Sequence, residues 1–323
     1  MKAMLTDEQK NLVWTEVDRP VPKADEVLIE TKAFSLNRAD LMQRNGDYPS
    51  PPGCPPWMGL EIAGTIAEIG ETAKKASNFN VGDRVCALLG GGGYAEFSAV
   101  QSGMVMPIPD GFSFAEAAAI PECYATAYLN LFYEGNLKKG ETFLVFAGAS
   151  GVGIAATQLA KLWGAKVIAT VRSDEKAEKI KKFGADLIVN TKTTDIETVF
   201  SQQEIDLVLD CVGGPDMGKC FGRMARYGRW IDIATLGGDV TELDLKTVYK
   251  KGLRLIGSTL RSRTPEMKAE ILKKLTEEVF PHFASGALRP EIYKTFSVEQ
   301  TDEAHAVMAA NENIGKLVVT LSR

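Results

Sequence analysis

A short apolar run followed by small residues marks a candidate phosphate-binding turn in the middle of the chain. Residues 143–146 are apolar, and residues 154–163 read as a helix. Strand, tight turn and helix in this order point backbone N–H groups at a pyrophosphate. The second glycine position holds Ser150, which is either a turn former or a hydroxyl donor near cofactor or substrate. The sequence predicts a dinucleotide site made by Ala147, Gly148, Ser150, Gly151, Val152 and Gly153.

The end of the next strand indicates which dinucleotide is bound. Residues 166–171 form an apolar strand, and Arg172 follows where an NAD enzyme usually carries an acidic residue for the ribose hydroxyls. An arginine in that place can pair with a 2′-phosphate. For Arg172, Ser173 and Lys176 the alternative is a solvated helix start, with Ser173 as its cap. We expect NADPH as the cofactor, held in part by these three residues.

Composition limits the class of protein. The chain has 323 residues, of which 45% are hydrophobic, and a net charge of −5. This length suggests roughly two domains, and the acidic balance argues against a nucleic-acid surface. No apolar stretch approaches the ~20 residues that span a bilayer, and no signal-peptide core follows Met1, so the cytosol is the expected compartment. The five cysteines show no CxxC spacing and are expected to be reduced.

Three stretches with different periodicity organise the chain. Residues 1–121 carry short alternating strands at 27–34, 62–69 and 81–89, separated by glycine and proline turns, which favours a β-barrel or sandwich. From residue 115 helix and strand alternate, which favours a doubly wound parallel sheet. The strands of this part are expected at 143–146, 166–171, 186–190, 206–210, 228–233 and 253–257, and its helices at 115–132, 154–163, 174–183 and 216–226.

The last part of the chain carries one amphipathic helix and a terminal strand. The helix is expected over residues 265–283, with Pro265 in its first turn. The strand covers residues 316–321 and follows a complete α/β unit. We expect this strand to return to the N-terminal β-domain.

Several motifs together resemble the medium-chain dehydrogenase/reductase superfamily. Residues 59–70 are similar to its G-H-E-x-x-G-x-V-x-x-x-G signature, and residues 81–85 and the turn at 147–153 follow in the same order. The resemblance implies an α/β fold, with a Rossmann domain at 122–261 that binds NADPH. It also implies a GroES-like domain at 1–121, completed by residues 262–323.

Departures from the superfamily pattern remove the metal ligands of its zinc enzymes. The signature histidine is Leu60, the place of a zinc-binding cysteine holds Asn37, and the third ligand position falls near Glu122 and Cys123. One remaining ligand cannot make a three-ligand zinc site. The two histidines, His282 and His305, lack a second ligand at metal spacing, and surface or packing roles are expected for them. We expect no metal.

The branch is identified by the pattern Asn37-x-x-Asp40-x-x-x-Arg44-x-Gly46-x-Tyr48. It resembles the zinc-free quinone oxidoreductases (zeta-crystallin-like), as do residues 210–214, 260–263 and 313–316. The resemblance implies an NADPH:quinone reductase that transfers a hydride, or single electrons, to a quinone in the cleft between the domains. It also implies a homodimer formed through the Rossmann domain.

The resemblance and the residue types suggest roles for individual side chains. An asparagine amide and a tyrosine hydroxyl are suitable donors to a carbonyl oxygen that gains charge, so Asn37 and Tyr48 are the candidate substrate contacts. Thr126 is expected near the nicotinamide, or is an ordinary helix residue. Gly315 and Lys316 are expected to approach the cofactor from the returning chain.

Other polar residues receive structural roles, and two further functions remain open. Asp40 and Arg44 are expected to hold their loop, whereas Arg261 and Arg263 either line the cleft or are solvated. An NADPH-dependent enone reductase needs the same cofactor geometry as a quinone reductase. A dinucleotide-binding sensor or structural protein is possible because fold does not dictate function.

Overall fold

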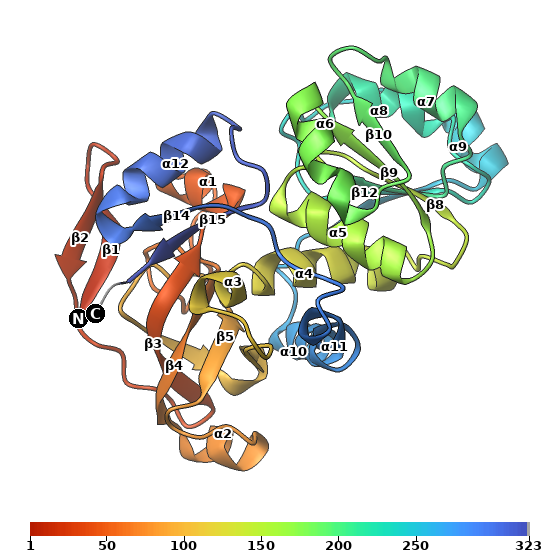
Figure 1. The fold of residues 1–323 in the computed structure, drawn as a ribbon. Helices are drawn as coiled ribbons and strands as arrows, with labels where there is room; N and C mark the ends of the chain where they lie inside the picture. Colours follow the sequence, from red (N-terminus) through yellow and green to blue (C-terminus); the bar gives the residue numbers. More distant parts are fainter. Residues whose placement is uncertain (322–323) are drawn as a thin grey trace. The chain divides into compact units, whose positions relative to one another are not determined.

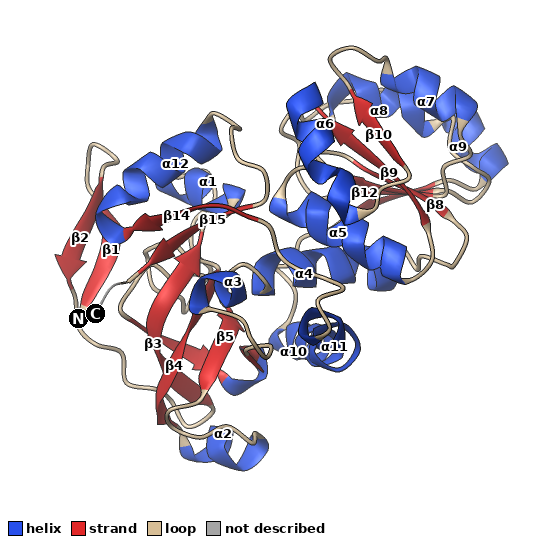
Figure 2. Cartoon of the chain, viewed as in Figure 1, coloured by secondary structure: helices blue, strands red, loops and turns tan. Residues whose placement is uncertain are grey.

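The computed structural model describes residues 1–321 and separates into two units, each with its own main sheet. Unit 1 consists of residues 1–125 with the described residues from 263 on, and unit 2 of residues 126–262. Unit 1 is rich in strands, and unit 2 alternates strands with helices (Figure 2). This arrangement confirms the predicted combination of a β-domain with a Rossmann-like α/β domain.

The main sheet of unit 1 has the strand order β14-β15-β3-β4-β5-β7, with β6 paired to β3, and β1 pairs with β2 in a separate two-stranded sheet. The strands of unit 1 are β1 (Lys2–Thr6), β2 (Leu12–Glu16), β3 (Glu26–Ser35), β4 (Glu61–Ile69), β5 (Arg84–Leu88), β6 (Phe97–Gln101), β7 (Val105–Pro107), β14 (Ile292–Ser297) and β15 (Lys316–Thr320). The terminal strand β15 runs antiparallel to β3, with Val318 opposite Ser35 (Figure 1). The predicted return of this strand to the N-terminal domain is confirmed.

Helical segments of unit 1 are short. They are α1 (Arg38–Asn45), α2 (Glu71–Ala76), η1 (Ser102–Met104), α3 (Phe114–Ala118), α10 (Pro265–Lys274), η4 (Leu275–Val279), α11 (Phe280–Ala284), η5 (Val298–Gln300) and α12 (Thr301–Ala309). The helix predicted over residues 265–283 is present but is not one regular α-helix, because η4 is a π-helical segment between α10 and α11. Pro281 lies in the first turn of α11, where its missing N–H would leave a regular α-helical ladder incomplete.

A second predicted helix, over residues 115–132, is also divided. Helix α3 ends at Ala118, and α4 (Pro121–Tyr128) begins at a proline and continues into the π-helical η2 (Leu129–Glu134). Proline disfavours helical backbone at the residue before it and has no N–H to donate, so the two helices separate at this point. Helix α4 starts in unit 1 and ends in unit 2.

The sheet of unit 2 is parallel throughout, with the order β10-β9-β8-β11-β12-β13. Its strands are β8 (Thr142–Val145), β9 (Lys166–Val171), β10 (Leu187–Asn190), β11 (Leu207–Asp210), β12 (Arg229–Asp232) and β13 (Arg254–Gly257). The chain extends from β8 in one direction and from β11 in the other. Ligands of such sheets bind beyond the carboxyl ends of the strands at this reversal, which here lies between β8 and β11.

Helices cover both faces of this sheet. They are α5 (Gly151–Leu162), α6 (Asp174–Ile180), η3 (Lys181–Phe183), α7 (Ile196–Gln202), α8 (Gly214–Phe221) and α9 (Leu245–Lys251). Helices α7 and α8 pack around the fully buried Trp230 on one face, whereas α5 contacts β8 and β9 on the other (Figure 1). Phe200 stacks on Trp230 with ring centroids 5.7 Å apart. Within residues 1–321, every helix is too short or too polar to span a bilayer.

Candidate functional site

The turn after β8 is packed as closely as a phosphate-binding turn requires. The N–H of Gly148 donates to the carbonyl oxygen of Thr170 at 2.7 Å. A Cβ on Gly148 would lie 2.8 Å from the Cβ of Ala169, and one on Gly153 would lie 2.4 Å from the carbonyl oxygen of Ala147. Ala147 has a positive φ of 51°, a strained conformation that often marks binding sites. Positions 148 and 153 therefore have room only for glycine.

Helix α5 offers backbone N–H groups to an anion at its first turn. Ser150 is the N-cap residue, and its Oγ accepts a hydrogen bond from the N–H of Gly153 at 3.0 Å. The N–H groups of Gly151 and Val152 have no acceptor inside the helix, because they belong to its first turn. With the helix dipole, they fit a pyrophosphate. The Ser150 hydroxyl thus acts as a cap, and its role toward cofactor or substrate stays a prediction.

The neighbouring strand β9 ends in an exposed cation. Arg172 is exposed and lies just before α6, whose N-cap residue is Ser173. The Ser173 Oγ accepts a hydrogen bond from the N–H of Lys176 at 3.2 Å, so Ser173 caps this helix. Asp174 has the first carboxylate after Arg172, and its Oδ1 accepts a hydrogen bond from Asn190 at 2.8 Å. Contacts of Arg172, Ser173 and Lys176 with a 2′-phosphate remain predictions.

On the other side of β8, strand β11 ends in a buried carboxylate. Asp210 is 1% exposed and accepts hydrogen bonds from the N–H groups of Val212 (2.7 Å) and Gly213 (3.2 Å) and from Trp230 Nε1 (3.1 Å). Burial raises the pKa of Asp210 to about 6. These bonds fix the loop after β11 at the reversal of the sheet. The sequence analysis singled out Asp210 only through the resemblance at residues 210–214. The local signal that could have indicated its role is an acidic residue at the end of an apolar strand.

Unit 1 contains a buried ion pair between β4 and β15. Glu61 is fully buried and Lys316 is 4% exposed, and the Lys316 Nζ lies 2.7 Å from the Glu61 Oε1. The same carboxylate accepts hydrogen bonds from the Ser35 hydroxyl at 2.5 Å and from the N–H of Glu122 at 2.8 Å. The Lys316 ammonium also donates to the carbonyl oxygen of Leu36 at 2.6 Å. Both charges therefore have the hydrogen-bond partners that burial demands.

Asn37, a predicted substrate contact, is held by both members of this pair. The Lys316 Nζ donates to the Asn37 Oδ1 at 2.7 Å, and the Asn37 Nδ2 donates to the Glu61 Oε1 at 3.0 Å. The structure thus brings together two residues, Asn37 and Lys316, that were predicted for substrate and cofactor respectively. All of these contacts lie within unit 1. A contact between Lys316 and the cofactor stays a prediction.

Asp40 and Arg44 hold the helix that follows Asn37. Asp40 is 1% exposed and accepts hydrogen bonds from the N–H groups of Asn37 (2.7 Å) and Gly59 (3.1 Å). Burial raises the pKa of Asp40 to about 6. Arg44 forms an ion pair with Asp302 of α12 at 2.6 Å. The predicted structural role of Asp40 and Arg44 is confirmed.

A buried histidine lies next to this helix. His305 is 2% exposed, and its Nε2 lies 3.3 Å from the hydroxyl of Tyr94, which in turn hydrogen-bonds to Asp40. Burial lowers the pKa of His305 to about 3, so this side chain is neutral at pH 7. Of the two roles considered for this histidine, surface and packing, the structure shows packing.

The positions that correspond to the zinc ligands of the zinc-dependent dehydrogenases hold other side chains in this protein. Leu60 is 2% exposed, and Asn37 is engaged by Glu61 and Lys316. Cys123 is 3% exposed, and burial raises the pKa of its thiol to about 12, which opposes the thiolate form that binds metals. Among residues 1–321, no group of three or more His, Cys, Asp or Glu residues is suited to a metal ion.

The other predicted site residues are distributed over the chain. Tyr48 is half-buried in the loop after α1, and no hydrogen bond joins it to Asn37 within residues 1–321. Thr126 lies on α4 and is 8% exposed. Gly315 has a φ of 77°, and a Cβ there would lie 2.3 Å from the carbonyl oxygen of Glu291. Contacts of Tyr48, Thr126 and Gly315 with substrate or cofactor stay predictions.

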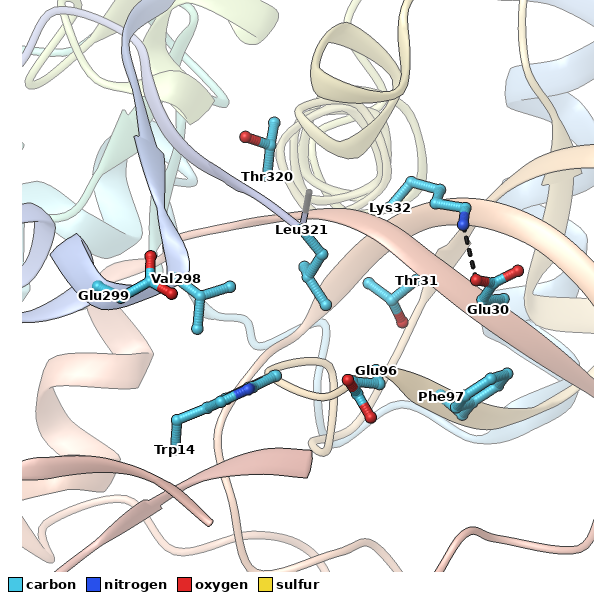
Figure 3. A pocket seen from close by; sticks show the side chains of 10 residues that line it. All are labelled: Trp14, Glu30, Thr31, Lys32, Glu96, Phe97, Val298, Glu299, Thr320 and Leu321. Carbon is cyan, nitrogen blue, oxygen red and sulfur yellow. Dashed lines mark hydrogen bonds and ion pairs between the residues drawn. The ribbon is translucent and has the colours of Figure 1, made fainter. Parts of the chain in front are cut away.

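A pocket of about 120 Å³ is formed within unit 1 by other residues (Figure 3). Trp14 and Phe97 contribute aromatic side chains to it, and Glu30 and Lys32 form an ion pair of 2.6 Å beside it. Thr31 belongs to its lining as well. No residue predicted from the sequence to bind cofactor or substrate lines this pocket.

Comparison with known proteins identifies both parts of the chain. Residues 23–110 match the alcohol dehydrogenase GroES-like domain, and residues 151–277 match the zinc-binding dehydrogenase family. The structure resembles that of the CurK enoyl reductase with a TM-score of 0.86 and 27% identity, covering 99% of each chain. The fold and its cofactor-binding unit are thus those of a known group of oxidoreductases.

Similarity to individual proteins extends over nearly the whole chain. The acryloyl-coenzyme A reductase of Sulfurisphaera tokodaii is 30% identical, over 94% of this chain and 95% of that protein. The quinone oxidoreductase of Homo sapiens is 28% identical, over 95% and 92% respectively. The VAT-1 homolog of Danio rerio is 33% identical, but the chain spans only 65% of its length. This chain belongs to the medium-chain dehydrogenase/reductase superfamily, in its quinone oxidoreductase branch, and is an oxidoreductase with a nicotinamide-dinucleotide-binding fold.

Proposed function

We propose that this protein reduces quinones with NADPH and does so without a metal. The observation that carries the choice of NADPH is the exposed Arg172 at the end of β9, beside the turn of residues 148–153. Its guanidinium is suited to pair with a 2′-phosphate, while the first turn of α5 receives the pyrophosphate. Ser173 and Lys176, at the start of α6, add a hydroxyl and a second cation to this phosphate site.

The acceptor is held through its carbonyl oxygen. Asn37 and Tyr48 donate hydrogen bonds to this oxygen, which gains negative charge during reduction. When bound, NADPH would supply two electrons and a hydrogen as hydride from its nicotinamide, and Thr126, Gly315 and Lys316 are the residues expected to contact it. The quinone takes up this hydride and one proton from solvent to become a hydroquinone, and NADPH becomes NADP⁺.

A second candidate is the reduction of a carbon–carbon double bond conjugated with a carbonyl. Its support comes from the acryloyl-coenzyme A reductase and the enoyl reductase among the similar proteins. In this reaction the hydride goes to the β-carbon, and the carbonyl oxygen carries the charge of an enolate. The same donors, Asn37 and Tyr48, would stabilise that oxygen. Protonation by solvent then gives a saturated ketone and NADP⁺.

The deciding experiment measures consumption of NADPH and of NADH with an ortho-quinone and with an α,β-unsaturated ketone, and identifies the products. Hydroquinone formation that is faster with NADPH supports the first proposal. A saturated ketone as the main product favours the second. Tight NADPH binding without turnover of either acceptor would count against both and would indicate a sensor or structural role.

We also propose a cytoplasmic homodimer that forms through unit 2. Strand β13 is at the edge of the parallel sheet and leaves one row of backbone N–H and C=O groups unpaired within the unit. Leu255 on this strand is 48% exposed, and Tyr249 on α9 just before it is 70% exposed. A second copy of β13 would pair with this edge and cover these apolar side chains.

A further inference from the structure

The orientation of the Asn37 amide is fixed by two charged groups. Its Oδ1 lies 2.7 Å from the Lys316 Nζ, and its Nδ2 lies 3.0 Å from the Glu61 Oε1. An ammonium can only donate and a carboxylate can only accept, so a flipped amide would lose both hydrogen bonds. One N–H of the amide points at Glu61, and the other has no acceptor within residues 1–321.

The two groups that fix the amide are themselves locked. Glu61 is fully buried and receives the Ser35 hydroxyl and the N–H of Glu122 in addition to Lys316. Burial alone would lower the pKa of Lys316, but the neighbouring Glu61 carboxylate opposes this effect and the pKa lies above its ordinary value, so the ammonium stays charged. A permanent positive charge therefore lies against the oxygen of the Asn37 amide.

The start of helix α1 makes no demand on the N–H groups of this amide, because a helix start offers backbone donors and not acceptors. The backbone N–H of Asn37 is satisfied by the carboxylate of Asp40 at 2.7 Å, and the side-chain Nδ2 donates to Glu61. Asn37 is half-buried, unlike the fully buried Glu61. Its second N–H is therefore the part of this network that has hydrogen-bonding capacity left.

We propose that Lys316 and Glu61 are positioning residues that make Asn37 a strong hydrogen-bond donor to the carbonyl oxygen of the acceptor. This inference rests on the proposed reductase function. Hydrogen bonds in a chain polarise one another, so the ammonium at Oδ1 strengthens donation from the remaining N–H. An amide polarised in this way stabilises the negative charge that develops on the carbonyl oxygen of the acceptor during reduction. Glu61 fixes the direction of the amide and balances the buried charge.

A double-mutant cycle tests whether Lys316 acts through Asn37. The variants are Lys316→Met, Asn37→Ala and the two combined, measured for kcat with the quinone and for NADPH dissociation by fluorescence titration. Removing a positioned donor can cost about 10²–10³-fold in kcat, and quinones are easily reduced, so we expect roughly tenfold for each single variant. We expect the combined variant to match Asn37→Ala in kcat at saturating NADPH, whereas a loss of NADPH affinity in Lys316→Met would report the separate proposed contact of Lys316 with the cofactor. Single effects that multiply in the combined variant would overturn the inference.

Two further variants separate this role from folding. Lys316→Met leaves the Glu61 carboxylate without its cation, so Lys316→Met with Glu61→Gln removes both charges, with Gln as long as Glu and Met one atom shorter than Lys. This variant is expected to fold and to retain the low kcat, and full activity would contradict the role of Lys316. Lys294→Met is the matched control. Lys294 lies on β14 of the same sheet and also forms an ion pair, with Glu303 of α12 at 2.6 Å, but its side chain is exposed. It is expected to keep the parental kcat.

The orientation of the amide has a readout that does not depend on activity. In protein labelled with ¹⁵N-asparagine, the Asn37 side-chain signals are assigned by their absence in Asn37→Ala. We expect these signals to shift in Lys316→Met and to stay unchanged in Lys294→Met. Unchanged signals in Lys316→Met would refute the orienting role whatever the reaction is. Shifted signals together with full turnover by Asn37→Ala would instead refute the substrate role of Asn37 and leave the orientation intact.

Discussion

Glu61 at the start of β4 and Lys316 at the start of β15 form an ion pair of 2.7 Å that is closed off from solvent. The pair joins the N-terminal part of the chain to the strand that completes the same sheet. Removing one partner from a buried pair leaves an uncompensated charge, which is more harmful than removing both. The stability of unit 1 and the orientation of Asn37 thus depend on the same contact.

This dependence predicts the stability of the variants. Lys316→Met should lower the free energy of unfolding by about 3–5 kcal/mol, because the Glu61 carboxylate remains buried without its cation. The double variant Lys316→Met with Glu61→Gln should lose less. Urea unfolding of both proteins, followed by circular dichroism, measures the difference. Equal stability of the single and double variants would show that Glu61 does not depend on Lys316.

Arg172→Asp should weaken NADPH binding far more than NADH binding. The substitution replaces a partner of the 2′-phosphate by a repelling carboxylate that suits the ribose hydroxyls of NADH. Fluorescence titration with both cofactors gives the ratio of dissociation constants. Lys166→Asp is the matched control, because Lys166 is exposed at the opposite end of the same strand. Arg172 is not a partner of the 2′-phosphate if Arg172→Asp and the control show the same ratio of dissociation constants for NADPH and NADH.

Tyr48→Phe should lower turnover of the acceptor without changing NADPH affinity. The substitution removes only the hydroxyl, and a well-placed donor of this kind is worth ~2.7–4 kcal/mol in favourable enzymes. Because quinones are easily reduced, we expect a smaller loss, of about tenfold in kcat/KM. Tyr293→Phe is the control, since Tyr293 is 41% exposed in the same unit. A change in NADPH affinity with normal turnover would speak against a substrate contact.

His305 should make the protein less stable as the pH falls below 7. The pKa of His305 is lowered to about 3 by burial, whereas an unfolded histidine has a pKa of about 6.5. Between these values the unfolded state binds more protons, so the stabilising contribution is complete above pH 6.5 and is lost as the pH falls toward 3. In this range the contribution of His305 to the free energy of unfolding falls by up to about 1.4 kcal/mol for each pH unit.

The variant His305→Phe tests this pH dependence. Phenylalanine keeps a ring in the edge-on contact with Tyr94, which has a centroid distance of 5.9 Å, but cannot be protonated. Urea unfolding at several pH values between 7 and 4 should give a shallower loss of stability than in the parent. Identical slopes for the two proteins would assign the acid sensitivity to other groups.

Much of the fold could be predicted because periodicity is a local property. Alternation located β3 and β4, and the strand–turn–helix pattern located β8 and α5. The divided helix near Pro121 was missed because apolar spacing continued across the proline. The burial of His305 was not predictable, since its helix pattern does not show which neighbour covers it. The pairing of Glu61 with Lys316 depends on β4 and β15 sharing one sheet, which no local pattern contains.

Leu255→Lys should convert the proposed homodimer to a monomer. Leu255 is 48% exposed on β13, and a lysine on an edge strand disfavours pairing with a second chain. Leu187→Lys is the matched control, because Leu187 is 37% exposed on β10, the opposite edge of the same sheet. Sedimentation equilibrium should report a dimer for the parent and for Leu187→Lys, and a monomer for Leu255→Lys. A monomeric parent would refute the dimer, whereas dissociation by Leu187→Lys alone would move the interface to β10.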